Sequence, residues 1–80
     1  MDQYYNDRDA YAMLGNMYSL GQGVERNPDK ACECFEKAAE MGHVEAMRAT
    51  AEMNYRGGMI HKPSFAKAVK WYHKAAECGD

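Results

Sequence analysis

The chain has 80 residues, with ten basic and twelve acidic side chains and a formal net charge of −2. Nucleic-acid binding usually needs a strongly basic face, so this balance argues against that class of partner. No apolar run approaches the roughly 18 residues that a membrane-spanning helix needs, so we expect no membrane insertion. A domain this small buries only about 60–65% of its unfolded surface and has a thin margin of stability.

The three cysteines do not suggest a disulfide framework. Their number is odd, and Cys32 and Cys34 are separated by a single residue. Residues 1–7 are polar and acidic, and they lack the basic and apolar regions of a signal peptide. We therefore expect reduced thiols and a cytoplasmic location.

Residues 1–7 are expected to form a short lead-in before a first helix from about residue 8 to residue 20. Apolar and small residues recur there at three- and four-residue steps, which indicates a helix with one buried side. These residues are Ala10, Leu14, Met17, Tyr18 and Gly21. Gly15 lies inside the helix, where glycine costs about 1 kcal/mol relative to alanine. We interpret it as a notch that lets another segment come close, with simple sequence drift as the alternative.

A second helix is predicted from Pro28 to about residue 41. Asn27 is a good N-cap, and proline suits the first helical position. Gly21 ends the preceding helix, because glycine takes the left-handed conformation cheaply. The expected buried stripe of the second helix consists of Ala31, Phe35 and Ala38.

Two further helices are predicted in the second half of the chain. The third covers roughly residues 44–55 and ends at Gly57-Gly58. The fourth begins after a Ser64 N-cap and runs to residue 78. Its buried residues are expected to be Ala68, one of Trp71 and Tyr72, and Ala75.

The two halves of the chain are copies of one another. Lys37-Ala38-Ala39-Glu40 returns 37 positions later as Lys74-Ala75-Ala76-Glu77, and the same offset gives ten identities in all. Around the third helix an offset of 36 also matches, with Gly57 over Gly21. One residue is therefore inserted between Tyr55 and Ser64, at a position that the sequence leaves open. A repeat with a period in the thirties is typical of helical repeat arrays.

These residues resemble the Sel-1-like repeat, a relative of the tetratricopeptide repeat. The first unit carries Leu14-Gly15, the glycines around residue 22 and the Lys-Ala-Ala-Glu run, whereas the second departs from the pattern with Thr50-Ala51 in place of Leu-Gly. The resemblance implies an all-α fold, an α/α solenoid of two antiparallel helix pairs, with repeats at residues 8–43 and 44–80. It also implies adaptor or scaffold proteins without shared catalytic residues.

The resemblance further implies that this chain has a concave binding surface, which is lined by the first helix of each unit. The outward positions of the first helix are expected to be Ala12, Asn16 and Ser19. The 36-residue register gives Arg48, Glu52 and Tyr55 on the third helix. The 37-residue register gives Ala49, Met53 and Arg56 instead.

The fourth helix adds a second candidate surface. Its basic residues and those of its entry loop are His61, Lys62, Lys67, Lys70, His73 and Lys74. Residues 1–43 carry four basic and eight acidic side chains, a charge of −4, and residues 44–80 carry six and four, a charge of +2. The basic run is either an ordinary solvated face or a docking surface for an acidic partner, and we name Lys70, His73 and Lys74 as its candidates.

Metal or catalytic chemistry is the alternative to a binding role. The possible ligands are Cys32, Cys34, Cys78, His43, His61 and His73. On a helix the sulfurs of Cys32 and Cys34 point about 160° apart, given about 100° per residue, so one zinc ion cannot readily take both. No nucleophile with a base and an orienting group is visible.

We therefore predict a non-catalytic protein–protein interaction module without a cofactor, acting as an adaptor or a small inhibitor of a larger protein. The alternatives are a small metal-dependent enzyme that uses the Cys/His set, or a fragment of a longer scaffold array. Met1 favours a whole protein and the end flush with a repeat favours a fragment. We also expect a weak homodimer through like ends, because each repeat leaves an apolar side for a neighbour. The candidate residues are Val69, Trp71 or Tyr72, and Cys78 at one end, and Tyr4, Tyr5 and Tyr11 at the other.

Overall fold

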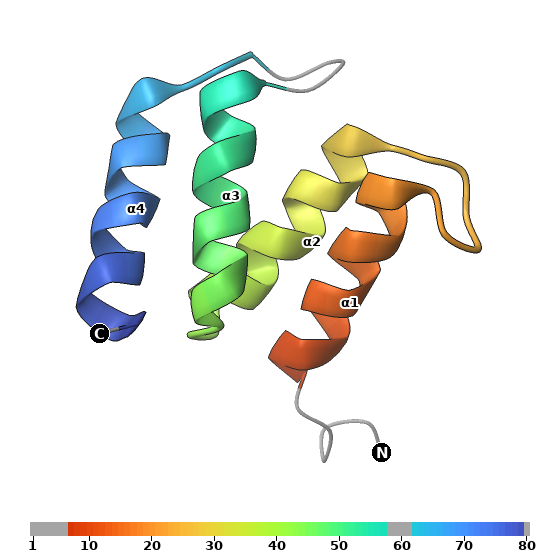
Figure 1. Ribbon diagram of the computed structural model, residues 1–80, viewed down its shortest axis with the longest axis horizontal. Coiled ribbons are helices and arrows are strands. Elements are labelled where there is room, and N and C mark those ends of the chain that lie inside the picture. The colour runs from red at the N-terminus through yellow and green to blue at the C-terminus, as the bar shows by residue number, and fades with distance from the viewer. Residues whose placement is uncertain (1–6, 58–61, 80) are drawn as a thin grey trace.

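The computed structural model describes residues 7–57 and 62–79, and residues 1–6, 58–61 and 80 lie outside this description. The described residues form four helices and no strand (Figure 1). The helices are α1 (Asp7–Leu20), α2 (Pro28–Glu40), α3 (Val44–Arg56) and α4 (Phe65–Gly79). The expected all-α solenoid of two helix pairs is confirmed. Helix α1 begins one residue earlier than expected, and the rest of the lead-in falls outside the described residues.

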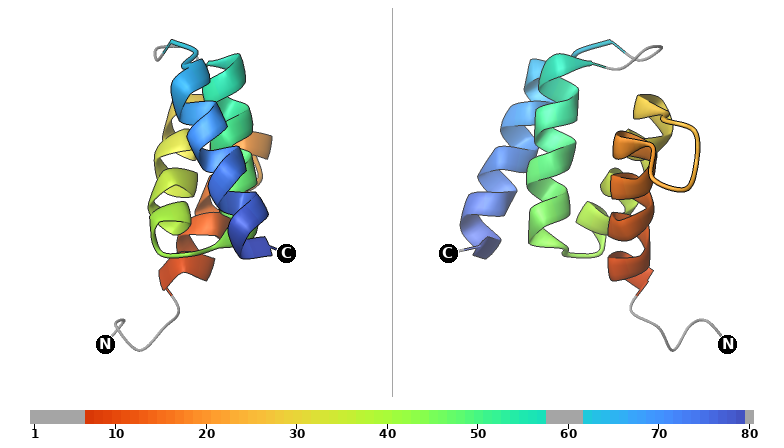
Figure 2. Two further views of the ribbon diagram at one scale, coloured as in Figure 1. Left: turned by 90° about the vertical axis from the view of Figure 1, so that its left-hand side faces the viewer. Right: turned by 45° about the vertical axis from the view of Figure 1, so that its right-hand side comes forward.

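Successive helices run antiparallel to one another and pack as neighbours. Helix α1 packs on α2 and α3 packs on α4, which gives two hairpins, and α2 also packs on α3 and joins them. Figure 2 shows the two hairpins from two further sides. Because α1 and α3 run in the same direction, their carboxyl ends lie at the same end of the molecule (Figure 1).

The beginnings of three helices are fixed by side chains. The Asn27 side chain accepts a hydrogen bond from the backbone N–H of Lys30 at 3.1 Å, and Ser64 Oγ accepts one from Lys67 at 3.3 Å. Both predicted N-caps are confirmed. The third cap was not predicted: His43 Nδ1 accepts a hydrogen bond from the backbone N–H of Ala46 at 3.0 Å. Each cap satisfies a donor that the helix itself cannot.

The core of the first hairpin is built around Phe35. The predicted stripe of α2 is buried as expected, with Ala31 and Ala38 fully enclosed. A Cβ atom on Gly15 of α1 would lie only 2.8 Å from Cδ1 of Phe35. The absence of a side chain at this position is therefore what allows the ring to pack against α1, and the notch interpretation of Gly15 is confirmed.

The predicted faces of α1 are wrong in part. Ala10 is exposed and Leu14 is 38% exposed, although both were expected inside. Ala12, expected to face outward, is only 7% exposed and belongs to the buried cluster that continues into α3. A helix of a solenoid has one side for its own partner and another for the neighbouring repeat, and a helical wheel does not tell these two sides apart.

In α4 the structure decides between the two aromatic residues. Trp71 is 4% exposed and lies in the core with Ala68 and Ala75, whereas Tyr72 is 47% exposed. The expected end patch therefore loses Trp71 but keeps Val69, Tyr72 and Cys78, which are exposed.

The structure also places the inserted residue. Gly21 and Gly57 both have positive φ and both donate a backbone hydrogen bond of 2.7 Å, to Met17 and Met53 respectively. The 36-residue offset therefore holds to the end of α3. In α4 the buried Ala68 and Ala75 correspond to Ala31 and Ala38 of α2, which is an offset of 37. The extra residue thus lies between Gly57 and the N-cap at Ser64.

One main-chain hydrogen bond closes each hairpin in the same way. The N–H of Asn27 donates to the carbonyl of Tyr18 at 2.9 Å, and the N–H of Ser64 donates to the carbonyl of Asn54 at 2.7 Å. In both hairpins the N-cap residue of the second helix is tied to the last turn of the first. The additional linker residue does not change this arrangement.

Candidate functional site

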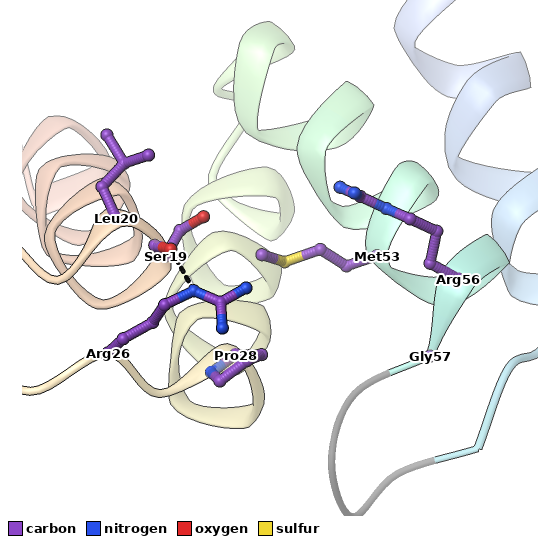
Figure 3. Close-up of a pocket in the computed structure, with 7 residues that line it drawn as sticks. All are labelled: Ser19, Leu20, Arg26, Pro28, Met53, Arg56 and Gly57. Carbon is purple, nitrogen blue, oxygen red and sulfur yellow. Dashed lines mark hydrogen bonds between the residues drawn. The ribbon is translucent and has the colours of Figure 1, made fainter.

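A groove opens between the two hairpins, where the carboxyl ends of α1 and α3 lie at the same end of the molecule (Figure 3). Its volume is about 610 Å³. The lining residues are Ser19, Leu20, Arg26, Pro28, Met53, Arg56 and Gly57. The first hairpin supplies one wall of the groove and the last turn of α3 supplies the other.

The groove carries an arginine on each wall, and both side chains extend toward the space between the hairpins (Figure 3). Arg26 Nε donates to the backbone carbonyl of Ser19 at 3.2 Å, which fixes the position of its guanidinium. Arg56 Nη2 lies 3.8 Å from Glu52 Oε1, and both of these side chains are mostly exposed. An exposed pair of this kind contributes little, so Arg56 remains available to another carboxylate.

Apolar groups accompany the two arginines. The Met53 side chain extends across the groove toward the first hairpin (Figure 3). Leu20 is largely exposed at the end of α1. The flexible thioether of Met53 provides an adaptable apolar contact. The groove therefore combines positive charge with the apolar side chain of Met53.

The groove lining brings together three of the residues that were expected to face outward, Ser19, Met53 and Arg56. Asn16 is exposed on α1 outside the groove lining. The 36-residue register of α3 makes Arg48, Glu52 and Tyr55 the counterparts of Ala12, Asn16 and Ser19, and these three side chains are exposed. Of these, Glu52 meets the groove through Arg56, and Tyr55 instead packs on Phe65 with ring centroids 5.3 Å apart.

The predicted basic face of α4 forms a separate surface. Lys70 Nζ lies 5.2 Å from the centre of the Trp71 ring, and His73 Nε2 lies 3.1 Å from Glu77 Oε2. Lys74 is exposed on the same helix. Two of the three candidate residues therefore have partners within α4. His61 lies outside the described residues.

Arg26 was missed as a site residue. It lies in the linker between α1 and α2, which the sequence presents only as a turn and a helix cap. The groove forms because the turn at Gly21 folds the linker back, so that the Arg26 Cβ lies within 3.3 Å of a Cβ built on Gly21. In the sequence, a basic residue shortly before an N-cap is only a weak signal of a binding site. Arg26 becomes a candidate only because the second hairpin places Arg56 on the opposite wall of the groove.

The cysteines and histidines do not gather into one site within the described ranges. No group of three or more Cys, His, Asp or Glu side chains there could hold a metal ion. Burial raises the pKa of the Cys32 thiol to about 11, with a smaller contribution from nearby Glu36, and burial also raises the pKa of Cys34. Such thiols are poor nucleophiles, since the thiolate is the reactive form.

No helix among the described residues is long and apolar enough to cross a membrane.

Known proteins resemble this chain over most of its length. It is 38% identical over 74 residues to an uncharacterized protein of Neisseria meningitidis serogroup B, a match that covers 92% of this chain and 16% of that protein. It is 36% identical over 67 residues to the protein SHC1 of Saccharomyces cerevisiae, which covers 78% of this chain and 13% of that protein. The chain thus spans less than a fifth of the length of these two curated relatives.

A solved structure and a family model agree with these relatives. The crystal structure of a Sel1 repeat protein from Oxalobacter formigenes superimposes with a TM-score of 0.81 at 38% identity, over 89% of this chain and 29% of that chain. A family model described as Sel1 repeat matches residues 8–43 and again residues 44–80. Proteins of this kind are generally protein-interaction modules and are typically non-catalytic. With both of its helical hairpins matched, the chain belongs to the Sel1 repeat family.

Proposed function

We propose that this chain is a non-catalytic module that binds an acidic segment of another protein in the groove between α1 and α3. The observation that carries this proposal is the pair of arginines, Arg26 and Arg56, on opposite walls of that groove. Guanidinium groups suit carboxylates because their planar donors form two parallel hydrogen bonds. A partner with acidic side chains next to an apolar one would match both the arginines and the Met53 side chain.

The groove is a better candidate than the basic face of α4. Lys70 and His73 lie against partners on their own helix. Arg26 and Arg56 instead flank a cavity large enough to enclose several side chains of a partner. An adaptor role, or occlusion of a surface on a larger protein, would follow from this binding, and a reducing cytoplasm would suit the buried thiols.

A peptide selection tests the proposal without a known partner. Random twelve-residue peptides displayed on phage are selected on the immobilised chain, and an enriched peptide is then measured by fluorescence anisotropy. We expect enrichment of Asp and Glu beside apolar residues. Arg56→Glu should weaken the binding of that peptide at least 10-fold, since it replaces an attractive charge by a repulsive one.

Lys74→Glu is the matched control, because it makes the same change in charge on the exposed face of α4. It should leave the affinity within about 3-fold of the parent, which is the effect of a remote surface charge. Equal losses for the two variants, or enriched peptides without acidic residues, would contradict the groove as the binding site. Circular dichroism establishes that each variant keeps its helices.

A further inference from the structure

Helix α4 exposes an apolar stripe along its outer side. The residues follow one another at steps of four, three and four, which places them on one side of a helix. They are Phe65, Val69, Tyr72 and Ala76, and we call them the back face. Phe65 and Val69 are 64% and 66% exposed. A continuous apolar stripe of this kind on a small domain is a sign of an interaction site.

The counterpart of the back face within the chain is covered. The 37-residue offset maps the back face onto Pro28, Cys32, Phe35 and Ala39 of α2. Cys32, Phe35 and Ala39 are buried, and Pro28 is partly buried. Helix α2 packs on α1 and on α3, whereas α4 packs on α3 alone among the helix pairs with substantial contact. The difference at Cys32 and Ala39 thus marks the side of the second helix on which the next repeat docks, whereas Phe35 packs on Gly15 of its own hairpin.

Helix α1 shows the complementary difference. Ala10, Met13 and Leu14, which we call the front face, are exposed. Their counterparts in α3 at the 36-residue offset are Ala46, Ala49 and Thr50, of which the first and last are fully buried and Ala49 is partly buried. Helix α3 has α2 as a neighbour on one side and α4 on the other, whereas α1 packs mainly on α2. The front face is therefore the side of α1 that corresponds to the docking side of α3.

We propose that the back face of one copy docks on the front face of a second copy, and so repeats between molecules the packing of α2 on α3. Each molecule carries both halves of this junction, and both halves are apolar and exposed. The net charges of the two halves favour this arrangement, since residues 1–43, which include the front face, carry −4 and residues 44–80, which include the back face, carry +2. Front-to-back contact brings half-chains of opposite net charge together, whereas contact of like ends brings half-chains of the same net charge together. Because a front-to-back contact does not close on itself, it builds open chains.

The test is sedimentation equilibrium on the whole chain and on two face variants. Val69→Asp places a charge on the back face, and Leu14→Asp places one on the front face. For the parent we expect an average mass that rises with concentration above 9.1 kDa and beyond twice that value. Each variant alone should remain a monomer, because one half of every junction is blocked. An equimolar mixture should form one-to-one dimers, since one variant keeps its front face and the other keeps its back face.

Every other outcome overturns the proposal. A parent that stays at 9.1 kDa at hundreds of micromolar shows that a second copy does not occupy the faces. If Leu14→Asp alone forms dimers, the back faces meet each other in the like-end dimer expected from the sequence. If Val69→Asp alone forms dimers, the front faces meet. Met41→Asp, at an exposed position outside both faces, is the control and should associate like the parent.

Discussion

Replacement of Gly15 by alanine tests the packing of the first hairpin most directly. In an exposed helical position this change stabilises a protein by about 1 kcal/mol, because alanine loses less backbone entropy. Here the new Cβ would lie 2.8 Å from Cδ1 and 2.9 Å from Cε1 and Cγ of Phe35. Real Cβ atoms do not approach a ring so closely, so the ring or the helix must shift. The ring is buried and cannot swing into solvent.

The net magnitude follows from two opposing terms. Overpacking of a filled core costs typically 1–3 kcal/mol, and contact with three ring atoms places Gly15→Ala at about 2–3 kcal/mol. Subtraction of the helix gain of about 1 kcal/mol leaves a net loss of about 1–2 kcal/mol. For a chain of this size the melting temperature should fall by roughly 4–16 °C.

Thermal unfolding followed by circular dichroism measures this loss, and two further variants isolate its cause. Asn16→Ala, one residue away and exposed, should stabilise the chain by about 0.5 kcal/mol, because only helix propensity changes there. Gly15→Ala should cost less stability in a Phe35→Leu background than in the parent, since the leucine removes ring atoms from the notch. An increase in melting temperature for Gly15→Ala would refute the close contact between α1 and the ring.

Four other predictions concern the core, a cap and the thiols. Phe35→Ala should cost about 3–5 kcal/mol, most of the stability of so small a domain, so that a variant melting within a few degrees of the parent would contradict the burial of the ring. Asn27→Ala should cost about 1 kcal/mol in urea unfolding, because the backbone N–H of Lys30 loses its acceptor, and an unchanged midpoint would count against that cap. Burial raises the pKa of Cys32 from 9.0 to about 11, so an aromatic disulfide reagent at pH 8 should modify exposed Cys78 quickly and Cys32 about 100-fold more slowly. The unfolded chain releases this thiol proton near pH 9 and the folded chain near pH 11, so the free energy of unfolding should fall by about 1 kcal/mol more between pH 8 and pH 10 than in Cys32→Ala.

The helices and their ends could be predicted because their causes are local. Asn27, Ser64 and Gly21 act through hydrogen bonds or backbone angles within a few residues of themselves. The repeat then supplied the pairing of the helices, since each unit resembles a known hairpin. Gly15 could also be interpreted correctly, because an unfavourable residue inside a helix points to a close contact that compensates for it.

The faces and the groove could not be predicted in full because they depend on neighbours. Ala10 and Ala46 are equivalent residues, yet one is exposed and the other buried, since only the second has a preceding helix against it. Arg26 belongs to the groove only through the position of Arg56, which is 30 residues away in the chain. Likewise, Trp71 and Tyr72 are adjacent aromatics, and the rotation of α4 on α3 decides which one is enclosed.

The hydrogen bond that closes each hairpin runs between main-chain atoms, and this has a consequence for how such surfaces change. The carbonyl that accepts the bond belongs to a tyrosine in one repeat and to an asparagine in the other. Any residue supplies the same carbonyl, so this closing hydrogen bond does not itself depend on the side chain, whereas Tyr18 also packs on the core and the buried Asn54 side chain donates to the Thr50 carbonyl. The next residue along the chain also differs between the repeats, since it is Ser19 in the first and Tyr55 in the second. The main-chain bond that closes each hairpin and the neighbouring side chain of the predicted binding surface thus belong to different groups of the same last turn, so that the predicted surface can vary there while the closing bond is kept.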